Sequence, residues 1–404
     1  MMNDIRPDKS GSVTTPGGYR ACGIRCGLKE KGKDLALIVS DSPASAAALF
    51  TTNKLPAPCI EISRRIISDG RARALVINSG NANACTGEQG KKNVLVMIER
   101  TAEGLVLDKD QILAANTGII GVPLPMDILL HGISIACTSL SPQGGIDAAQ
   151  AIMTTDTIPK HGAVEFDVHG KRCRIGAIAK GSGMINPNMA TMICILTTDI
   201  AIQSDLLRKA LIEASDTTLN ALTVDGEMST NDAVFLFANG TCGNEKILSV
   251  NKDYRSFVDA LTILTRQITL DLARDGEGAT KLVTIRVTDA VSADEAKIAA
   301  KAIANSMLVK TAIFGQDPNW GRIVQSVGAC DVSMNADRLN ILFDDVVVLQ
   351  KGKASDFAAD RVRKILKQGQ LLITVSLGVG EKEATVYTCD LTHDYITINA
   401  DYHT

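Results

Sequence analysis

The sequence predicts a two-lobed protein of mixed α/β class, with strands and helices arranged in layers. Short apolar segments bounded by turn residues alternate along the chain with longer segments of helical periodicity. At 404 residues the chain is long for a single hydrophobic core, which favours two lobes. Near residue 191 a Gly/Asn/Pro loop runs directly into a β-branched apolar strand. We expect that strand to lie inside a sheet built by both halves of the chain.

In the first half, strands are predicted at 34–40 and 74–78, where apolar residues are bounded by turn residues. A hairpin is predicted from 164–168 and 172–178, because polar and apolar residues alternate on either side of the turn at His169-Gly170. A helix is predicted at 91–105, with one apolar face formed by Val94, Leu95, Ile98, Ala102 and Leu105.

In the second half, residues 191–197 are predicted to form a strand and residues 204–221 a helix with Ser204 as its N-cap. A longer helix is predicted at 254–273, ending at a turn that contains Asp275-Gly276. The other predicted elements are helices at 293–306 and 356–367 and strands at 281–287, 339–348, 371–376 and 384–388.

Composition is typical of a globular protein, with 45% hydrophobic and 22% charged residues. The formal net charge is -3 and the basic residues are spread along the chain, so neither a nucleic acid nor an anionic membrane is an expected partner. No apolar run has the length of a membrane span, and the N-terminus lacks the apolar core of a signal peptide. We expect a cytoplasmic protein.

The ten cysteines form no CxxC pair and have no companion histidine at metal-ligand spacing, which predicts free thiols and no metal site. The five histidines form no cluster in the sequence. No Ser-His-Asp or Cys-His arrangement is evident in the sequence, although the folded chain could still bring such residues together. This leaves room for a nucleophile that supplies its own base.

The peptide bond Ala190-Thr191 is the most informative junction, because a small residue is followed by threonine where a loop meets a strand. The Thr191 hydroxyl could attack the preceding carbonyl, and the freed α-amine, with a reference pKa of about 7.7–8.0, could then act as the base. Self-cleavage there would give an α chain of residues 1–190 and a β chain of 191–404. An ordinary loop that enters a core strand is the competing interpretation of the junction alone.

A series of motifs extends over nearly the whole chain, including Asn78-Ser-Gly-Asn-Ala-Asn-Ala-Cys-Thr-Gly87 and Asp317-Pro-Asn-Trp-Gly-Arg322. The others lie at 18–24, 50–53, 116–121, 153–157, 180–199, 223–232, 275–281 and 398–404. In this order they resemble the ornithine acetyltransferase (glutamate N-acetyltransferase) family, whose enzymes move an acetyl group between N-acetylornithine and glutamate. One departure is Asn116, which stands where the family commonly has serine.

The resemblance implies a set of site residues. Thr191 would be the nucleophile and its own base, and Thr117 with Gly118 would form the oxyanion hole. Lys180 would bind the α-carboxylate of each substrate. Local sequence alone indicates less, namely a simple turn for the Thr117-Gly118 pair and a solvated surface lysine for Lys180.

Four further substrate contacts are implied by the resemblance. Thr154 is one of them, although it could merely cap backbone groups. Glu277, between two glycines, could hold the ornithine side-chain ammonium or the freed amine of Thr191. Asn399 and Thr404 complete the set, and a chain terminus such as Thr404 is ordinarily frayed.

The activity implied is a two-step transfer of acetyl from N2-acetylornithine to glutamate through acetyl-Thr191, with small-molecule substrates and no cofactor. The family also contains enzymes that accept acetyl-CoA as a co-substrate, and the sequence leaves this open. The resemblance further implies a heterotetramer of two α and two β chains. The alternatives are a self-cleaving amidohydrolase or aminopeptidase with an N-terminal nucleophile, and a metabolite-binding protein that remains one uncut chain.

Overall fold

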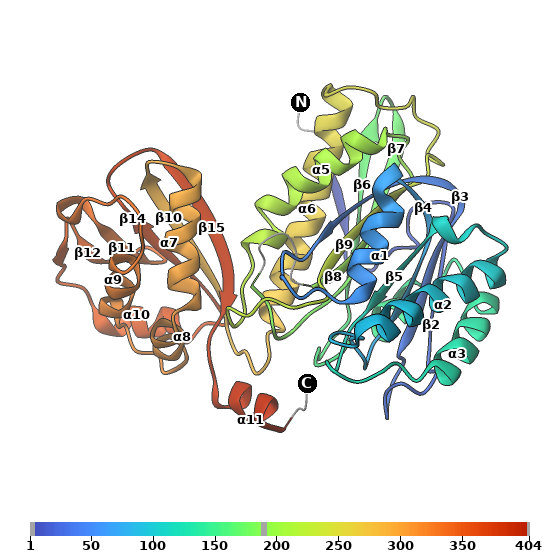
Figure 1. Ribbon diagram of the computed structural model, residues 1–404. Coiled ribbons are helices and arrows are strands. Elements are labelled where there is room, and N and C mark those ends of the chain that lie inside the picture. Colours follow the sequence, from blue (N-terminus) through green and yellow to red (C-terminus); the bar gives the residue numbers. More distant parts are fainter. Residues whose placement is uncertain (1–4, 187–191, 402–404) are drawn as a thin grey trace.

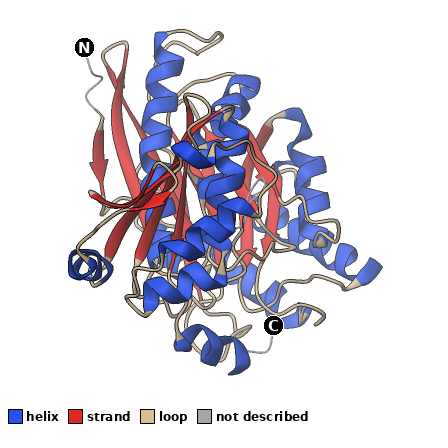
Figure 2. Cartoon of the chain, turned by 90° about the vertical axis from the view of Figure 1, so that its left-hand side faces the viewer, coloured by secondary structure: helices blue, strands red, loops and turns tan. Residues whose placement is uncertain are grey.

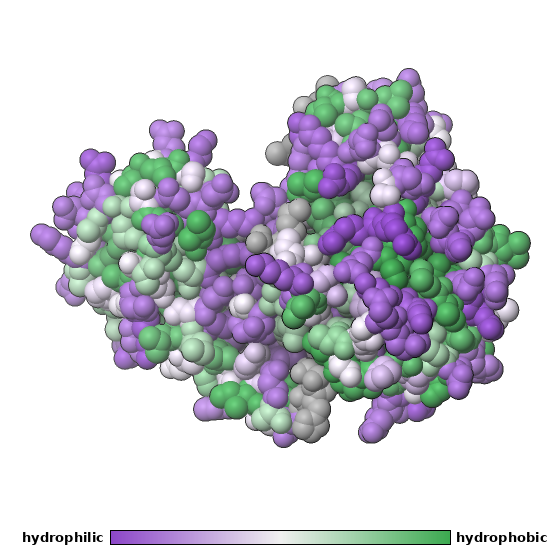
Figure 3. Space-filling model, in the orientation of Figure 1, coloured by the Kyte–Doolittle hydropathy of each residue, from purple (hydrophilic) through white to green (hydrophobic). Residues whose placement is uncertain are grey.

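The computed structural model describes residues 5–186 and 192–401. Two lobes lie side by side, the larger built around a nine-stranded sheet and the smaller around a six-stranded sheet (Figure 1). This confirms the predicted two-lobed architecture of mixed α/β class. The surface of both lobes is largely hydrophilic in the view of Figure 3, which also shows a notch between them. None of the helices in these two ranges is long and apolar enough to cross a bilayer.

The larger sheet is mixed, with strands in the order β1-β6-β7-β8-β9-β3-β4-β5 and β2 paired to β3. Strand β8 is antiparallel to β7 and parallel to β9, and β9 is antiparallel to β3. The strands are β1 (Arg6–Asp8), β2 (Tyr19–Ile24), β3 (Leu35–Phe50), β4 (Arg71–Asn78), β5 (Ile112–Asn116), β6 (Lys160–Val168), β7 (Lys171–Lys180), β8 (Ile193–Thr198) and β9 (Ala233–Ala238).

Helices cover both faces of this sheet. One core includes residues of α1 (Pro58–Ile66), α2 (Gly87–Leu105), α3 (Met126–Thr138) and α4 (Gly145–Ala151). The other includes residues of α5 (Ser204–Asp216) and α6 (Lys252–Arg274).

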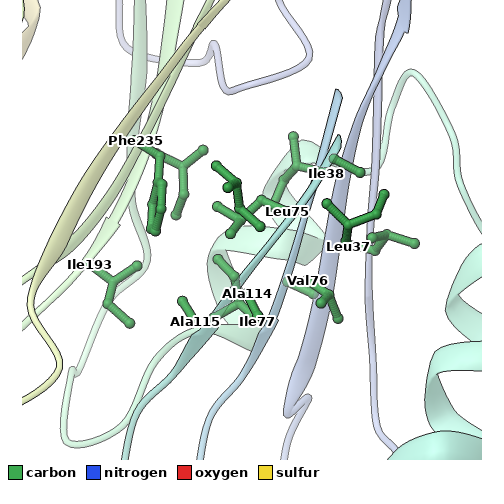
Figure 4. Packing of buried hydrophobic residues seen from close by; sticks show 14 of the residues in the cluster. Leu37, Ile38, Leu75, Val76, Ile77, Ala114, Ala115, Ile193 and Phe235 are labelled. Atoms are coloured by element: carbon green, nitrogen blue, oxygen red, sulfur yellow. The ribbon is translucent and has the colours of Figure 1, made fainter. Parts of the chain in front are cut away.

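Strand β8 shows why helices are needed on both sides. Ile193 and Ile195 lie in the first core, and Cys194 and Leu196 lie in the second. Ile193 faces that first core together with Phe235 of β9 (Figure 4). Successive side chains of a strand point to opposite faces, so an unbroken apolar segment can be buried only where both faces are covered.

The smaller lobe is formed entirely by the second half of the chain, with strands in the order β13-β12-β11-β14-β10-β15. Its strands are β10 (Leu282–Ala290), β11 (Asn340–Phe343), β12 (Val346–Gln350), β13 (Lys353–Ala354), β14 (Gln370–Ser376) and β15 (Lys382–Cys389). Its helices are α7 (Ala293–Asn305), α8 (Met307–Phe314), α9 (Trp320–Gly328) and α10 (Ala359–Leu366). After β15, helix α11 (His393–Asp401) lies below the junction of the lobes (Figure 1). The segments before and after the Ala190-Thr191 bond therefore share the larger sheet, whereas the smaller sheet belongs to the second segment alone.

Figure 2 shows the chain turned by 90°, with helices, strands and loops distinguished by colour. Short 3-10 helices connect several of these elements. They are η1 (Ile67–Asp69), η2 (Lys109–Gln111), η3 (Leu219–Ala221) and η4 (Ala336–Arg338).

Several predicted elements are confirmed, among them α2, the β6-β7 hairpin, α6 and α7. The single strand predicted at 339–348 is wrong, because the chain turns at Asp344, whose φ is 48°, and forms the hairpin of β11 and β12. The helix predicted at 204–221 ends at Asp216, and η3 follows as a separate turn. Its N-cap is Gln203 rather than Ser204, and no side-chain hydrogen bond caps this end.

Candidate active site

A cleft in the larger lobe opens beside the ends of β5, β7 and β8, and helix α11 reaches its rim. Six of the predicted site residues line it: Thr117, Gly118, Thr154, Lys180, Glu277 and Asn399. The remaining lining residues are Ala82, Ile120, Thr155, Gly181, Gly183, Met184, Met192, Ile193, Ser229, Thr230, Asn231 and Asp232. The cleft combines polar side chains with an apolar lining, and it receives residues from both halves of the chain.

The Thr117-Gly118 turn follows β5 and has a fixed backbone geometry. Gly118 has a φ of +131°, and a Cβ atom there would lie 2.3 Å from the carbonyl carbon of Gly80, so only glycine fits. The Thr117 N–H donates to the Asn78 carbonyl at 3.0 Å and is therefore already used. The donors that this turn can offer a developing oxyanion are the Thr117 hydroxyl and the Gly118 N–H.

Buried asparagines support this turn. The amide of Asn231 donates to the carbonyls of Ala82 at 2.7 Å and Asn116 at 2.8 Å. The amide of Asn116 in turn donates to the Asn78 side chain at 2.5 Å. Asn116, the residue directly before Thr117, is therefore held both at its backbone carbonyl and at its side chain.

Lys180 ends β7 and points its ammonium at the turn. Its Nζ lies 3.4 Å from Thr117 Oγ1. Burial lowers the pKa of Lys180 below its usual value, while attraction to Asp156, Asp232 and Glu277 opposes this effect. The result is a cation beside the candidate oxyanion donors, held in a partly buried position among acids.

Behind Lys180 lies a buried ionic cluster that we call the Lys160 cluster, formed by Lys160, Asp156 and Asp275. The Lys160 ammonium contacts both carboxylates and donates to the Gly181 carbonyl at 3.1 Å. Asp156 accepts the Gly181 N–H at 2.7 Å. Burial by itself would raise the pKa of Asp156, but the two nearby lysine ammoniums and this hydrogen bond lower it to about 2. The cluster fixes the backbone where β7 leaves the sheet.

Glu277 lies in the turn after α6 and is held from two sides. Its N–H donates to the Ser182 carbonyl at 2.9 Å, and its carboxylate accepts the amide of Asn399 at 2.7 Å. A Cβ atom at Gly183 would lie 2.4 Å from that carboxylate, so a larger residue there would displace the Glu277 side chain. The Thr154 N–H donates to the carboxylate of Asp156 at 2.9 Å.

Asp232 is the acid in the cleft to which no role was assigned from the sequence. Its residue is 4% exposed, and its Oδ2 has no hydrogen-bond partner among the described residues. Burial raises the pKa of Asp232 well above its usual value, and attraction to Lys180 only partly offsets this. It reaches the cleft because β8 and β9 pair in parallel, with Ile193 beside Ala233.

Comparison with known proteins gives a match to the ArgJ family over residues 20–404. The chain belongs to the ArgJ family. A protein of Symbiobacterium thermophilum called arginine biosynthesis bifunctional protein ArgJ is 44% identical, over 98% of this chain and 99% of the relative. The protein of the same name from Chlorobaculum tepidum is also 44% identical, over 100% of each. This confirms the family that the sequence motifs indicated.

A solved structure of ornithine acetyltransferase complexed with ornithine, from Mycobacterium tuberculosis, is 37% identical in sequence. It covers 46% of this chain and 100% of the solved chain, with a TM-score of 0.44.

Three predicted residues of this ArgJ-family chain, Ala190, Thr191 and Thr404, lie outside the described residues. Met192, which follows Thr191 in the chain, lines the cleft. The roles assigned to the six residues in the cleft stay predictions, and their meeting at one place is the structural finding.

The sequence interpretation missed Ser229, Asn231 and Asp232 as lining residues. The signal was present, because 223–232 is one of the ArgJ-like motifs and ends in polar residues immediately before the apolar strand β9. Without the pairing of β8 with β9, however, nothing local places these residues near Lys180.

Proposed function

We propose that this chain transfers the acetyl group of N2-acetylornithine to glutamate in arginine biosynthesis, through an acetyl ester on Thr191. The observation that carries the proposal is membership of the ArgJ family over nearly the whole chain, since its relatives are arginine biosynthesis proteins. The cleft supports it because oxyanion donors, a cation and a carboxylate meet there from separate parts of the chain.

The first half-reaction forms the ester. The Thr191 hydroxyl attacks the acetyl carbonyl and its proton passes to the Thr191 α-amine. The developing oxyanion is stabilised by the Thr117 hydroxyl and the Gly118 N–H. The C–N bond of the amide then breaks, and ornithine leaves with the proton from the α-amine.

The second half-reaction reverses these roles. The α-amine of glutamate attacks the ester carbonyl through the same oxyanion, and N-acetylglutamate leaves as the Thr191 hydroxyl is restored. Lys180 binds the α-carboxylate that both substrates carry, and Glu277 binds either the ornithine ammonium or the Thr191 amine. Thr154, Asn399 and Thr404 complete the substrate contacts. No metal or organic cofactor takes part in these steps.

The Thr191 amine requires cleavage of the Ala190-Thr191 bond, which yields the α chain of 1–190 and the β chain of 191–404. The two chains assemble as a heterotetramer, two of each, in the cytoplasm, and the family-like motifs support this. Acetyl-CoA serves as a second donor if the enzyme is of the two-activity type, and its relatives are named bifunctional.

Steady-state and burst kinetics test the proposal. Initial rates at several glutamate concentrations should give parallel double-reciprocal lines, because donor and acceptor share one covalent intermediate. With N-acetylornithine alone, about one ornithine per site should be released rapidly before turnover slows. Thr191→Ala should abolish both the burst and the cleavage, whereas Thr191→Ser keeps a hydroxyl and should retain part of each.

The alternative functions give different results. Undiminished acetate release without glutamate would identify a hydrolase, and intersecting lines without a burst would exclude the covalent route. A wild-type chain that keeps its full mass after long incubation, with no peptide beginning at Thr191, would refute self-cleavage.

A further inference from the structure

Two cysteines and an aspartate, which lie at or just beyond the ends of three different strands, meet at the end of the larger sheet that lies away from the cleft. They are Cys173 near the start of β7, Asp199 directly after β8 and Cys242 in the turn after β9. One sulfur or carboxylate oxygen from each lies within 4.8 Å of the corresponding atoms of the other two. We call this set the Cys173 cluster.

The backbone presents the three side chains to one point. Asp199 and Arg174 are joined by two hydrogen bonds, because the Arg174 N–H donates to the Asp199 carboxylate at 2.7 Å and the Asp199 N–H donates to the Arg174 carbonyl at 3.4 Å. The Cys242 N–H donates to the Asp199 carbonyl at 2.8 Å. Cys173 lies in the β6-β7 ladder opposite Phe166, so all three residues are held by the main chain.

We propose that the Cys173 cluster is a structural binding site for one thiophilic divalent cation, for which Zn²⁺ is the natural probe. Two thiolates and a carboxylate are a donor set that Zn²⁺ takes in proteins. With bonds of about 2.3 Å to sulfur and 2.0–2.2 Å to oxygen, ligands of one tetrahedral ion lie about 3.5–3.8 Å apart. The three ligand atoms, which lie within 4.8 Å of one another, would therefore have to approach by about 1.3 Å at most on binding.

The surroundings supply what a bound cation requires. The Asp199 carboxylate accepts N–H bonds from Arg174 and, at 3.3 Å, from Gly17, which orients it as metal-ligating carboxylates generally are. Cys173 is buried but Cys242 is partly exposed, which provides an entry path and room for water as the fourth ligand. Burial raises the pKa of Asp199 and of Cys242, and Arg174 and Lys171 respectively offset part of this effect, so a bound cation would have to displace the thiol protons.

The site is distinct from the candidate active site. Cys173 and Lys180 lie near opposite ends of β7, seven residues or roughly 23 Å apart along an extended strand. The cation would join Cys173, before the Ala190-Thr191 bond, to Asp199 and Cys242, after it. This consequence, a metal link between the two chains of the cleaved enzyme, rests on the proposed function, whereas binding itself does not.

Metal capture by the whole protein tests the inference. Chelator-stripped protein incubated with Zn²⁺ and passed through a desalting column should retain about one equivalent. Co²⁺ in place of Zn²⁺ should give thiolate charge-transfer absorption and tetrahedral visible bands. Cys242→Ser should lose both signals. The matched control is Cys330→Ser, a partly exposed cysteine of the smaller lobe that should leave them unchanged.

Two further measurements keep the outcomes separate. The uncut Thr191→Ala variant should bind the metal as the wild type does, so that failure of cleavage and failure of the site are distinguishable. Asp199→Asn, which keeps an oxygen for the Arg174 N–H but places its amide NH2 group toward the Gly17 N–H, should weaken retention at least tenfold, as loss of a ligand would. Retention below a tenth of an equivalent, equal retention by Cys242→Ser, or a mass loss of two hydrogens as Cys173 and Cys242 form a disulfide instead would each overturn the inference.

Discussion

Gly118 combines a backbone conformation that favours glycine with the close approach of another chain segment. Substitution by alanine adds a Cβ atom that would lie 2.3 Å from the Gly80 backbone, so the turn must shift and carry the Thr117 hydroxyl with it. Displacing an oxyanion donor costs about 100- to 1,000-fold in kcat in other enzymes. We expect Gly118→Ala to lower the rate constants of both half-reactions by a similar factor.

Gly121→Ala is the matched control for this prediction. Gly121 has a φ of +81°, but no atom lies within 4 Å of the position of its Cβ. The variant should lose about 1–2 kcal/mol of stability from the left-handed backbone and keep its kcat. Equal rate constants for the two alanine variants in single-turnover assays would show that Thr117-Gly118 is an ordinary turn.

Asp232 predicts a pH dependence of stability. Its pKa is raised above 3.8 by burial, so the unfolded chain loses this proton at lower pH than the folded chain. Between the pKa of Asp232 in the unfolded chain and its pKa in the folded protein, the folded state binds more protons than the unfolded state. The free energy of unfolding therefore falls as pH rises through this range. Asp232→Asn carries no such proton, so it should be more stable than wild type at neutral pH, and the difference should vanish below about pH 4.

Urea unfolding of both proteins between about pH 4 and 8 measures this difference. Lys180 is the cation that faces Asp232, so the difference between the curves reports the aspartate together with its attraction to Lys180. Asp167→Asn, at an exposed position of β6, is the control and should follow the wild type. A constant offset across the whole range would mean that Asp232 ionises with the same pKa in the folded and the unfolded protein, so that burial does not raise it.

At the scale of elements, the Lys160 cluster joins the start of β6 to the end of β7 and to the turn after α6. The side chains of Lys160 and Asp156 are fully buried, and that of Asp275 is 6% exposed. Lys160→Met keeps the length of the side chain but leaves two buried carboxylates unpaired. Removing one partner of a buried ion pair costs about 3–5 kcal/mol, and we expect a loss of this size in denaturant unfolding.

The control is Lys171→Met, at an exposed position at the other end of the same hairpin, which should change stability by less than about 0.5 kcal/mol. Because Lys160 also bonds to the Gly181 carbonyl, its loss should loosen Lys180 and raise the KM of both substrates. Equal stability of the two variants would show that water or rearrangement satisfies Asp156 and Asp275.

Elements with a strong local pattern could be predicted from the sequence. The helical face of α2 and the alternation of the β6-β7 hairpin are examples. The turn at Asp344 was missed because the apolar residues on both sides suggested one continuous strand, although two aspartates interrupt them. Strand β9 was missed because a six-residue apolar run does not distinguish a strand from a buried helix by periodicity.

The residues of the candidate site also differ in whether the sequence could predict them. Thr117, Lys180 and Glu277 were predicted through motifs shared with a family, since a turn, a lysine and an acid have no meaning by themselves. Asp232 could not be placed, because its approach to Lys180 depends on the pairing of β8 with β9, some forty residues apart in sequence. The Cys173 cluster depends likewise on strand ends that only the folded sheet brings together.

The whole molecule is organised so that the predicted cleavage divides the chain but not the fold. Strands β8 and β9, from the second half, lie between β7 and β3, from the first half. The β7-β8 ladder runs from Ile175 beside Thr198 to Lys180 beside Ile193, and the β9-β3 ladder joins six residue pairs. Separating the halves would break both ladders and expose two apolar cores that they share.

We therefore expect the two chains of the cleaved enzyme to co-elute in gel filtration, in high salt as well as low. Salt screens charges but does not weaken an interface of buried apolar residues and backbone hydrogen bonds. Guanidinium chloride should release the two chains in the same transition in which circular dichroism reports unfolding of the larger sheet, whereas Thr191→Ala should unfold as one uncut chain. Release of a folded 1–190 chain before that transition would show that the shared sheet does not hold the halves together. If release of the chains and loss of β-structure coincide at every denaturant concentration, the shared sheet holds the halves together, because neither half then keeps a sheet without the other.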